Sequence, residues 1–102
     1  MREHYYYRRQ VVKLLNCDEA LLEELEAEEI VQSVTVEQEP ERVFSEDQVD
    51  RIRVALNLMR DLDVNMAGCG VILEMRESMI QMQERFDRIL DALVERMKQG
   101  DG

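Results

Sequence analysis

Residue types that build catalytic and metal sites are scarce in this chain of 102 residues, which has one histidine, two cysteines, one proline and no tryptophan. Cys17 and Cys69 lie far apart and form no CxxC pair, and the histidine is His4. Zinc or haem would therefore find too few ligands. We expect no metal, no cofactor and two free thiols in a reducing compartment.

Long apolar runs are also missing. No segment approaches the roughly 20 apolar residues that span a membrane, and no signal-peptide pattern opens the chain. The sequence also has no Gly-rich phosphate loop and no pairing of a nucleophile with a base. It therefore predicts a cytoplasmic protein that is not an enzyme.

Positive charge is missing from one part of the chain. The net charge is -10. Residues 18–41 contain ten acidic residues and neither Lys nor Arg, whereas the other 78 residues contain 13 acidic and 13 basic groups. One contiguous quarter of the chain thus carries the whole imbalance. Most charge runs are solvated helix faces, but a run of a single sign also suits a basic partner.

Apolar residues at helical spacing predict two short helices, over residues 8–15 and 19–28. Val11, Val12 and Leu15 share one face of the first helix. Asp18 is expected to cap the second helix, because its carboxylate can accept free backbone N–H groups. Leucines face inward and glutamates outward in that second helix: Leu21, Leu22 and Leu25 against Glu19, Glu23, Glu24, Glu26 and Glu28. Two helices joined by a tight turn form a helix-turn-helix outline.

Residues 30–44, called the wing below, change in character. β-Branched residues partly alternate with polar ones, and Pro40 interrupts the pattern. This pattern predicts a small β-hairpin with Val43 and Phe44 on the returning strand, or else an irregular segment. Before the first helix, the tyrosines of residues 5–7 are expected to pack over that helix.

A third helix is predicted over residues 46–62, beginning at an S-x-x-Q capping box formed by Ser45 and Gln48. Its core stripe consists of Val49, Ile52, Leu56 and Met59. Residues 63–70 break the helical pattern, because Gly68 and Gly70 weaken any helix there. Whether the helices around residues 63–78 are continuous stays open.

The last segment, residues 71–98, is the longest periodic one. Apolar residues recur in steps of three and four over three heptads: Ile72, Met75, Met79, Met82, Phe86, Ile89 and Leu93. The small domain before it cannot bury such a seam completely. The pattern therefore favours a coiled-coil homodimer, with packing back onto its own domain as the alternative.

The order of these elements resembles the MerR superfamily over residues 8–97. The matching stretches are RRQVVKLLNCDEALLEELEAEEIV, RVFSEDQVDRI and DLDVNMAGCGVILEMRESM. The resemblance implies a mainly α fold, with a winged helix-turn-helix domain over residues 1–70 and a C-terminal dimerisation helix over residues 71–102. The last stretch is similar to the heat-shock-repressor (HspR) branch and to the CbpM chaperone-modulator family.

The DNA-binding members of this superfamily place arginines along the second helix and in the wing. Here the second helix reads EALLEELEAEE, the wing keeps only Arg42, and Glu29 replaces the family's glycine before the wing. DNA binding depends on neutralising phosphates with Lys or Arg. Ten acids on the docking elements would oppose it, so DNA binding is not expected.

The resemblance to CbpM implies a different partner, the basic J-domain of a DnaJ/CbpA-like co-chaperone, whose action on DnaK the protein would inhibit. The expected partner-binding residues lie on the acidic second helix and beside it: Glu19, Glu23, Glu24 and Glu26, with Leu21 or Val31 as an apolar anchor.

Two alternatives stay open. An HspR-like repressor would need its basic side chains to gather on one surface: Arg2, Arg8, Arg9, Lys13, Arg42, Arg51 and Arg53. A redox or small-molecule sensor would use the seven methionines and two cysteines. Met75, Met79 and Met82, however, lie on the heptad stripe, where methionine is core filler.

Overall fold

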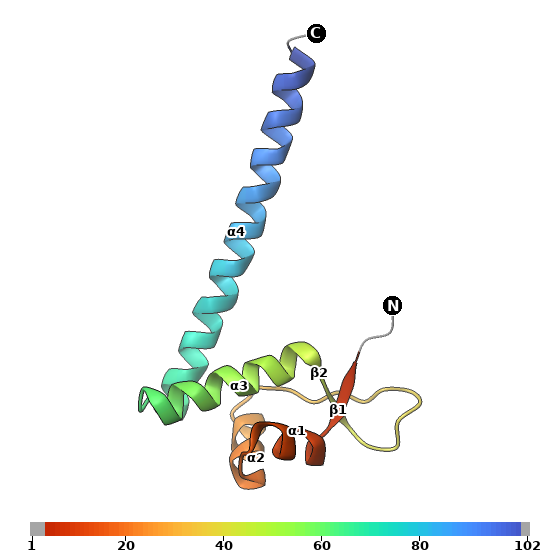
Figure 1. Ribbon diagram of the computed structural model, residues 1–102, viewed down its shortest axis with the longest axis vertical. Helices are drawn as coiled ribbons and strands as arrows, with labels where there is room; N and C mark the ends of the chain where they lie inside the picture. The colour runs from red at the N-terminus through yellow and green to blue at the C-terminus, as the bar shows by residue number, and fades with distance from the viewer. Residues whose placement is uncertain (1–3, 101–102) are drawn as a thin grey trace.

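The computed structural model describes residues 4–100. Its elements follow in the order β1 (Tyr5–Tyr7), α1 (Arg8–Leu15), α2 (Glu19–Ala27), β2 (Val43–Ser45), α3 (Glu46–Asp61) and α4 (Met66–Gly100). α1, α2 and the small sheet gather along α3, and α4 projects away from them as a long arm (Figure 1). The molecule therefore measures 61 × 38 × 20 Å. The predicted mainly α winged helix-turn-helix with a long C-terminal helix is confirmed.

Both short helices of the helix-turn-helix lie where the apolar spacing placed them. α1 ends at Asn16, whose φ of 51° is left-handed, and the N–H of Cys17 bonds to the Val12 carbonyl at 3.2 Å. Asn tolerates this conformation better than most residues. α2 begins after Asp18, but the Asp18 carboxylate accepts no capping hydrogen bond among the described residues. The helix start was thus predicted correctly and its cap was not.

The tyrosines at the start of the chain form a strand. β1 pairs antiparallel with β2, Tyr5 opposite Ser45 and Tyr7 opposite Val43. Tyr6 also packs against the core that includes Val11 of α1, in line with the expected packing over the first helix, whereas the strand was not predicted. Within the wing, the hairpin reduces to one bridge, in which Val34 and Val43 exchange two N–H···O bonds of 2.8 Å. Most of the wing is irregular.

The predicted capping box of α3 is half formed. The Ser45 hydroxyl accepts a hydrogen bond from the Gln48 N–H at 3.3 Å. The Gln48 side-chain oxygen instead accepts from the backbone N–H of Gln32 at 2.8 Å. This contact ties the start of the wing to the start of α3.

The expected break over residues 63–70 is shorter than predicted. The helix is interrupted only between Asp61 and Met66, and α4 then passes through both glycines. The Asn65 side-chain oxygen accepts the Gly68 N–H at 2.8 Å and caps the helix. A Cβ at Gly68 would stand 2.8 Å from Val64 Cγ1, so glycine gives this turn room to close. Cys69 and Leu73 then enter the core, and α4 crosses the expected boundary at residue 70 without interruption.

One core joins the helix-turn-helix, the sheet, α3 and the first turns of α4. It includes Leu22 and Leu25 of α2 and Phe44 of β2, together with Val49, Ile52 and Leu56 from the predicted stripe of α3. From residue 74 to residue 100, by contrast, every residue of α4 is exposed. Among the helices of the described chain, none has the length and apolar character needed to cross a membrane.

Candidate protein-binding surface

The outer face of α2 is acidic and closely approachable. Leu22 and Leu25 are buried, so the helical period turns the opposite side to solvent. That side exposes Glu23 and Glu24, with Ala20 and Ala27 a turn away along the same face. Because alanine side chains are small, a partner can come close to the helix backbone between the glutamates.

Glu26 points inward, in contrast to the expectation that it faces solvent. Its carboxylate lies 2.5 Å from Arg8 Nη2 and also accepts the Ser33 hydroxyl at 3.0 Å. Ser33 in turn accepts from Arg42 Nε at 2.9 Å, and its carbonyl accepts from Arg42 Nη2 at 2.6 Å. Glu26 therefore connects α1, α2 and the wing, and its carboxylate is already paired within the fold.

The two candidate apolar anchors differ in accessibility. Val31 is 1% exposed and belongs to the core, so a partner cannot reach it. Leu21 is half-buried and packs against the core edge. Of the two candidates, Leu21 is therefore the one that the fold leaves partly exposed.

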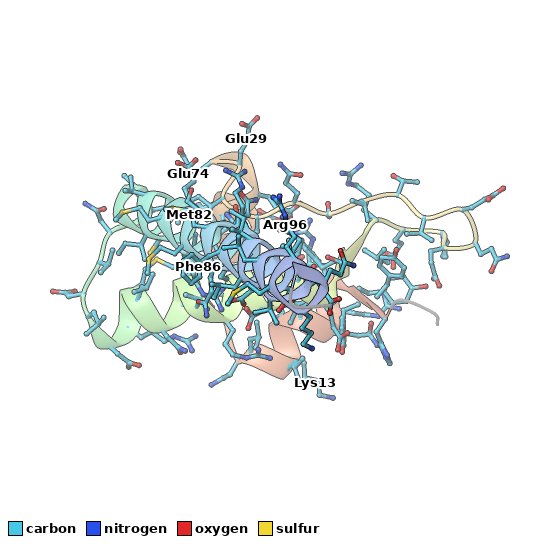
Figure 2. The ribbon with its side chains drawn as sticks, turned by 90° about the horizontal axis from the view of Figure 1, so that it is seen from above. Lys13, Glu29, Glu74, Met82, Phe86 and Arg96 are labelled. Carbon is cyan, nitrogen blue, oxygen red and sulfur yellow. The ribbon has the colours of Figure 1, made fainter. Side chains whose placement is uncertain are left out.

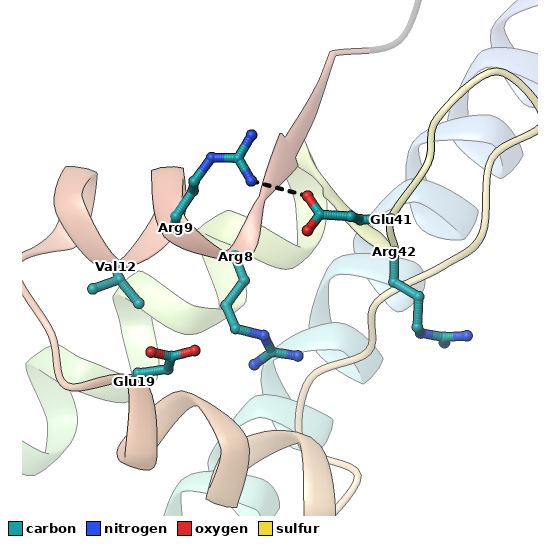
Figure 3. Close-up of a pocket in the computed structure, with 6 residues that line it drawn as sticks. All are labelled: Arg8, Arg9, Val12, Glu19, Glu41 and Arg42. Atoms are coloured by element: carbon teal, nitrogen blue, oxygen red, sulfur yellow. Dashed lines mark hydrogen bonds and ion pairs between the residues drawn. The ribbon is translucent and has the colours of Figure 1, made fainter.

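The arginines do not gather on one surface. Arg8, Arg9 and Arg42 surround a cleft between α1, α2 and the wing (Figure 3), and Arg9 pairs there with Glu41 at 2.9 Å. Arg51 instead donates to the Ile30 carbonyl and pairs with Glu77 of α4. Arg53 pairs with Asp50. Arg2 lies outside the described residues.

The apolar face of α4 is open to solvent along its length. The heptad residues are 37–68% exposed: Ile72, Met75, Met79, Met82, Phe86, Ile89 and Leu93. The heptad pattern missed five further exposed apolar residues of α4, Val71, Ile80, Leu90, Val94 and Met97. The apolar face is therefore wider than a strict two-position seam.

A known protein family matches the chain over most of this architecture. The family model described as MerR HTH family regulatory protein matches residues 7–90, from the end of β1 far into α4. The chain belongs to this MerR family. No curated protein and no solved structure matches it.

In this MerR-family protein, Glu29 occupies a backbone position that favours glycine. Its φ is 60°, in the left-handed region, at the turn that follows α2. Figure 2 shows Glu29 projecting outward from this turn, on the side of the molecule opposite Lys13. A strained residue that is not glycine is often associated with function. Glu29 was not among the predicted site residues, although the glycine replacement in the sequence was the signal for it.

Replacing Glu29 with glycine is expected to stabilise the protein by about 1 kcal/mol. A left-handed conformation costs a non-glycine residue about 1–2 kcal/mol, and glycine would remove this cost. Glycine also loses more conformational freedom on folding, which reduces the stabilisation by about 0.5–1 kcal/mol. Urea denaturation at fixed protein concentration measures the change. Glu28→Gly is the matched control, because Glu28 has a φ of -85° and is also exposed. An equal or greater gain from Glu28→Gly would contradict the strain at Glu29.

The two thiols of the MerR-family protein are free, and both are poorly placed for redox chemistry. Burial raises the pKa of the Cys17 thiol, which is half-buried, and of the Cys69 thiol, which is fully buried. Fewer reactive thiolates therefore form at neutral pH. Within residues 4–100, no group of three His, Cys, Asp or Glu side chains is arranged to hold a metal ion.

Proposed function

We propose that this MerR-family protein is a chaperone modulator that binds the basic J-domain of a DnaJ/CbpA-like co-chaperone and inhibits its action on DnaK. The observation that carries the proposal is that α2, the helix corresponding to the DNA-binding helix of MerR-family regulators, carries only acidic charges. The exposed acidic side chains on α2 and the turn after it form what we call the acidic surface: Glu19, Glu23, Glu24, Glu28 and Glu29.

The internal use of the arginines supports a protein partner over DNA. Arg8 and Arg42, which flank the acidic helix, are engaged with Glu26 and Ser33. A DNA-binding surface needs cations that meet phosphates and release counterions. Because Arg8 and Arg42 are already bonded to Glu26 and Ser33, fewer of their donors are free for phosphates, and the acidic surface itself would repel the DNA backbone.

A basic partner gains from the same surface in two ways. Opposite charge speeds the encounter and aligns the two proteins, although rim charges add little affinity. Leu21, Ala20 and Ala27 supply the close apolar contact that affinity requires. A J-domain held on α2 through its basic helix would be blocked, sterically and electrostatically, from DnaK.

The exposed face of α4 supports a homodimer as the second part of the proposal. From Glu74 onward, no other element within residues 4–100 covers the apolar side chains of this helix, although Arg76 and Glu77 form ion pairs with α3. In aqueous solution, an apolar face this long is normally buried against another protein surface. A second copy would cover it and would place two acidic surfaces in one particle.

The test is binding of a purified J-domain to the wild-type protein and to the double variant E23K/E24K. We expect the variant to bind at least about tenfold more weakly, because the double reversal replaces attraction with repulsion. The double variant E84K/E95K is the control, since it makes the same charge change on exposed residues of α4, far from the acidic surface. Isothermal titration calorimetry gives the affinities, and the J-stimulated ATPase of DnaK gives the inhibition.

Undiminished binding by E23K/E24K would show that α2 is not the interface. A gel shift with genomic DNA at low salt addresses the repressor alternative. Tight, salt-sensitive DNA binding by the wild-type protein would overturn the modulator function.

A further inference from the structure

A cleft of about 430 Å³ opens between α1, α2 and the wing, directly beside the acidic surface. It is lined by three arginines, two glutamates and a valine: Arg8, Arg9, Arg42, Glu19, Glu41 and Val12. Figure 3 shows the Arg8 side chain reaching from α1 into the space between Glu19 and Arg42. Since Glu19 belongs both to this cleft and to the acidic surface, a partner on α2 also meets the cleft.

The guanidinium groups around the cleft are held in place by the fold. The Arg9 guanidinium stacks 4.5 Å from the centre of the Tyr7 ring, and that of Arg8 lies 5.7 Å from the centre of Phe44. Arg42 is anchored by its bonds to Ser33. Groups that are already ordered lose little freedom when they bind an anion.

The arginines of the cleft differ in how firmly they are paired. Arg8 is held by the partly buried Glu26, whose carboxylate lies 2.5 Å from Arg8 Nη2. Arg9 also has a partner, Glu41, but their side chains are 70% and 57% exposed. Such an exposed pair contributes little stability, so another carboxylate can replace Glu41 at small cost.

We propose that this cleft binds one carboxylate side chain, an Asp or Glu, of the partner protein that docks on the acidic surface. Arginine presents paired N–H donors that match a carboxylate. The inference rests on the proposed function and deepens it. The surface then selects a partner whose basic residues flank one acidic residue, because a wholly basic helix would face the arginines with like charge.

The variant Arg9→Gln tests the inference by the sign of its effect. If the cleft takes a carboxylate, this variant binds the J-domain about tenfold more weakly than the wild type. If the partner presents only basic groups, removing a nearby positive charge strengthens binding. Arg88→Gln is the matched control, because it makes the same substitution at an exposed residue of α4, which projects away from the cleft (Figure 1). Circular dichroism checks that both variants fold.

A second arm identifies the carboxylate. Each Asp and Glu of the J-domain is changed in turn to Asn or Gln, and its binding is measured against wild type and Arg9→Gln. We expect one position at which the effect of Arg9→Gln disappears, as a direct contact requires.

The outcomes separate this inference from the proposed function. Wild-type binding that Arg9→Gln strengthens or leaves unchanged would overturn the cleft's role and keep the proposed function. A loss that couples to no acidic position of the J-domain, or saturable binding of free citrate by the protein alone, would overturn the assignment to a partner side chain. Absence of wild-type binding to any J-domain would overturn both.

Discussion

The proposed homodimer is expected to dissociate into monomers when Met82 and Phe86 are both replaced with glutamate. These side chains are 68% and 59% exposed in the single chain, and both lie on the apolar face of α4. Burying a Met or Phe side chain contributes about 1.5–3 kcal/mol. Removing two such groups from each copy weakens association by about 6 kcal/mol or more, which is a factor on the order of 10⁴ in the dissociation constant.

Size-exclusion chromatography with light scattering, at tens of micromolar protein, measures this change. The control is the double variant Gln81→Glu and Arg88→Gln, which makes the same change in net charge at exposed positions away from the apolar face of α4. We expect the control to stay dimeric. A monomeric wild type would show that α4 covers its apolar face in another way.

Replacing Arg51 with methionine is expected to destabilise the fold by about 2–3 kcal/mol. Arg51 Nε and Nη2 donate to the Ile30 carbonyl at 3.0 and 2.8 Å, and Nη1 pairs with Glu77. The arginine side chain is only 14% exposed. Methionine would fill much of the space but would leave the buried carbonyl of the turn after α2 without its donor.

Arg53→Met is the comparison on the same helix. Arg53 is 49% exposed and pairs with Asp50 at 3.3 Å, and an exposed pair of this kind contributes little. Urea denaturation at one fixed protein concentration measures both variants, since the apparent stability of a dimer depends on concentration. Equal losses from the two variants would show that the Ile30 contact does not hold the turn.

The contacts of Arg51 also bear on whether the partner is DNA or a basic protein. From the sequence it was one of the arginines that a DNA-binding surface would require. In the fold it connects the turn after α2, α3 and α4. Arg8 is likewise paired with Glu26, so both arginines hold elements of the fold together and have fewer donors left for DNA phosphates.

The helices and their inward faces could be predicted from the sequence because helix formation depends on local spacing. Leu22 and Leu25, and the stripe of Val49, Ile52 and Leu56, are buried as their period requires. The start of α3 at Ser45 likewise followed from a local capping signal. The charge imbalance of residues 18–41 needed only a count.

The tertiary structure decided the features that depend on distant residues. Strand β1 exists because residues 5–7 pair with residues 43–45, and nothing local to the tyrosines indicates that partner. α4 continues through Gly68 because the Asn65 cap and the burial of Leu73 outweigh the low helix propensity of glycine. Glu26 turns inward because Arg8 and Ser33, from two other segments, converge on it. The acidic charge of residues 18–41 was thus evident in the sequence, while the subset of those charges facing solvent was set by long-range contacts.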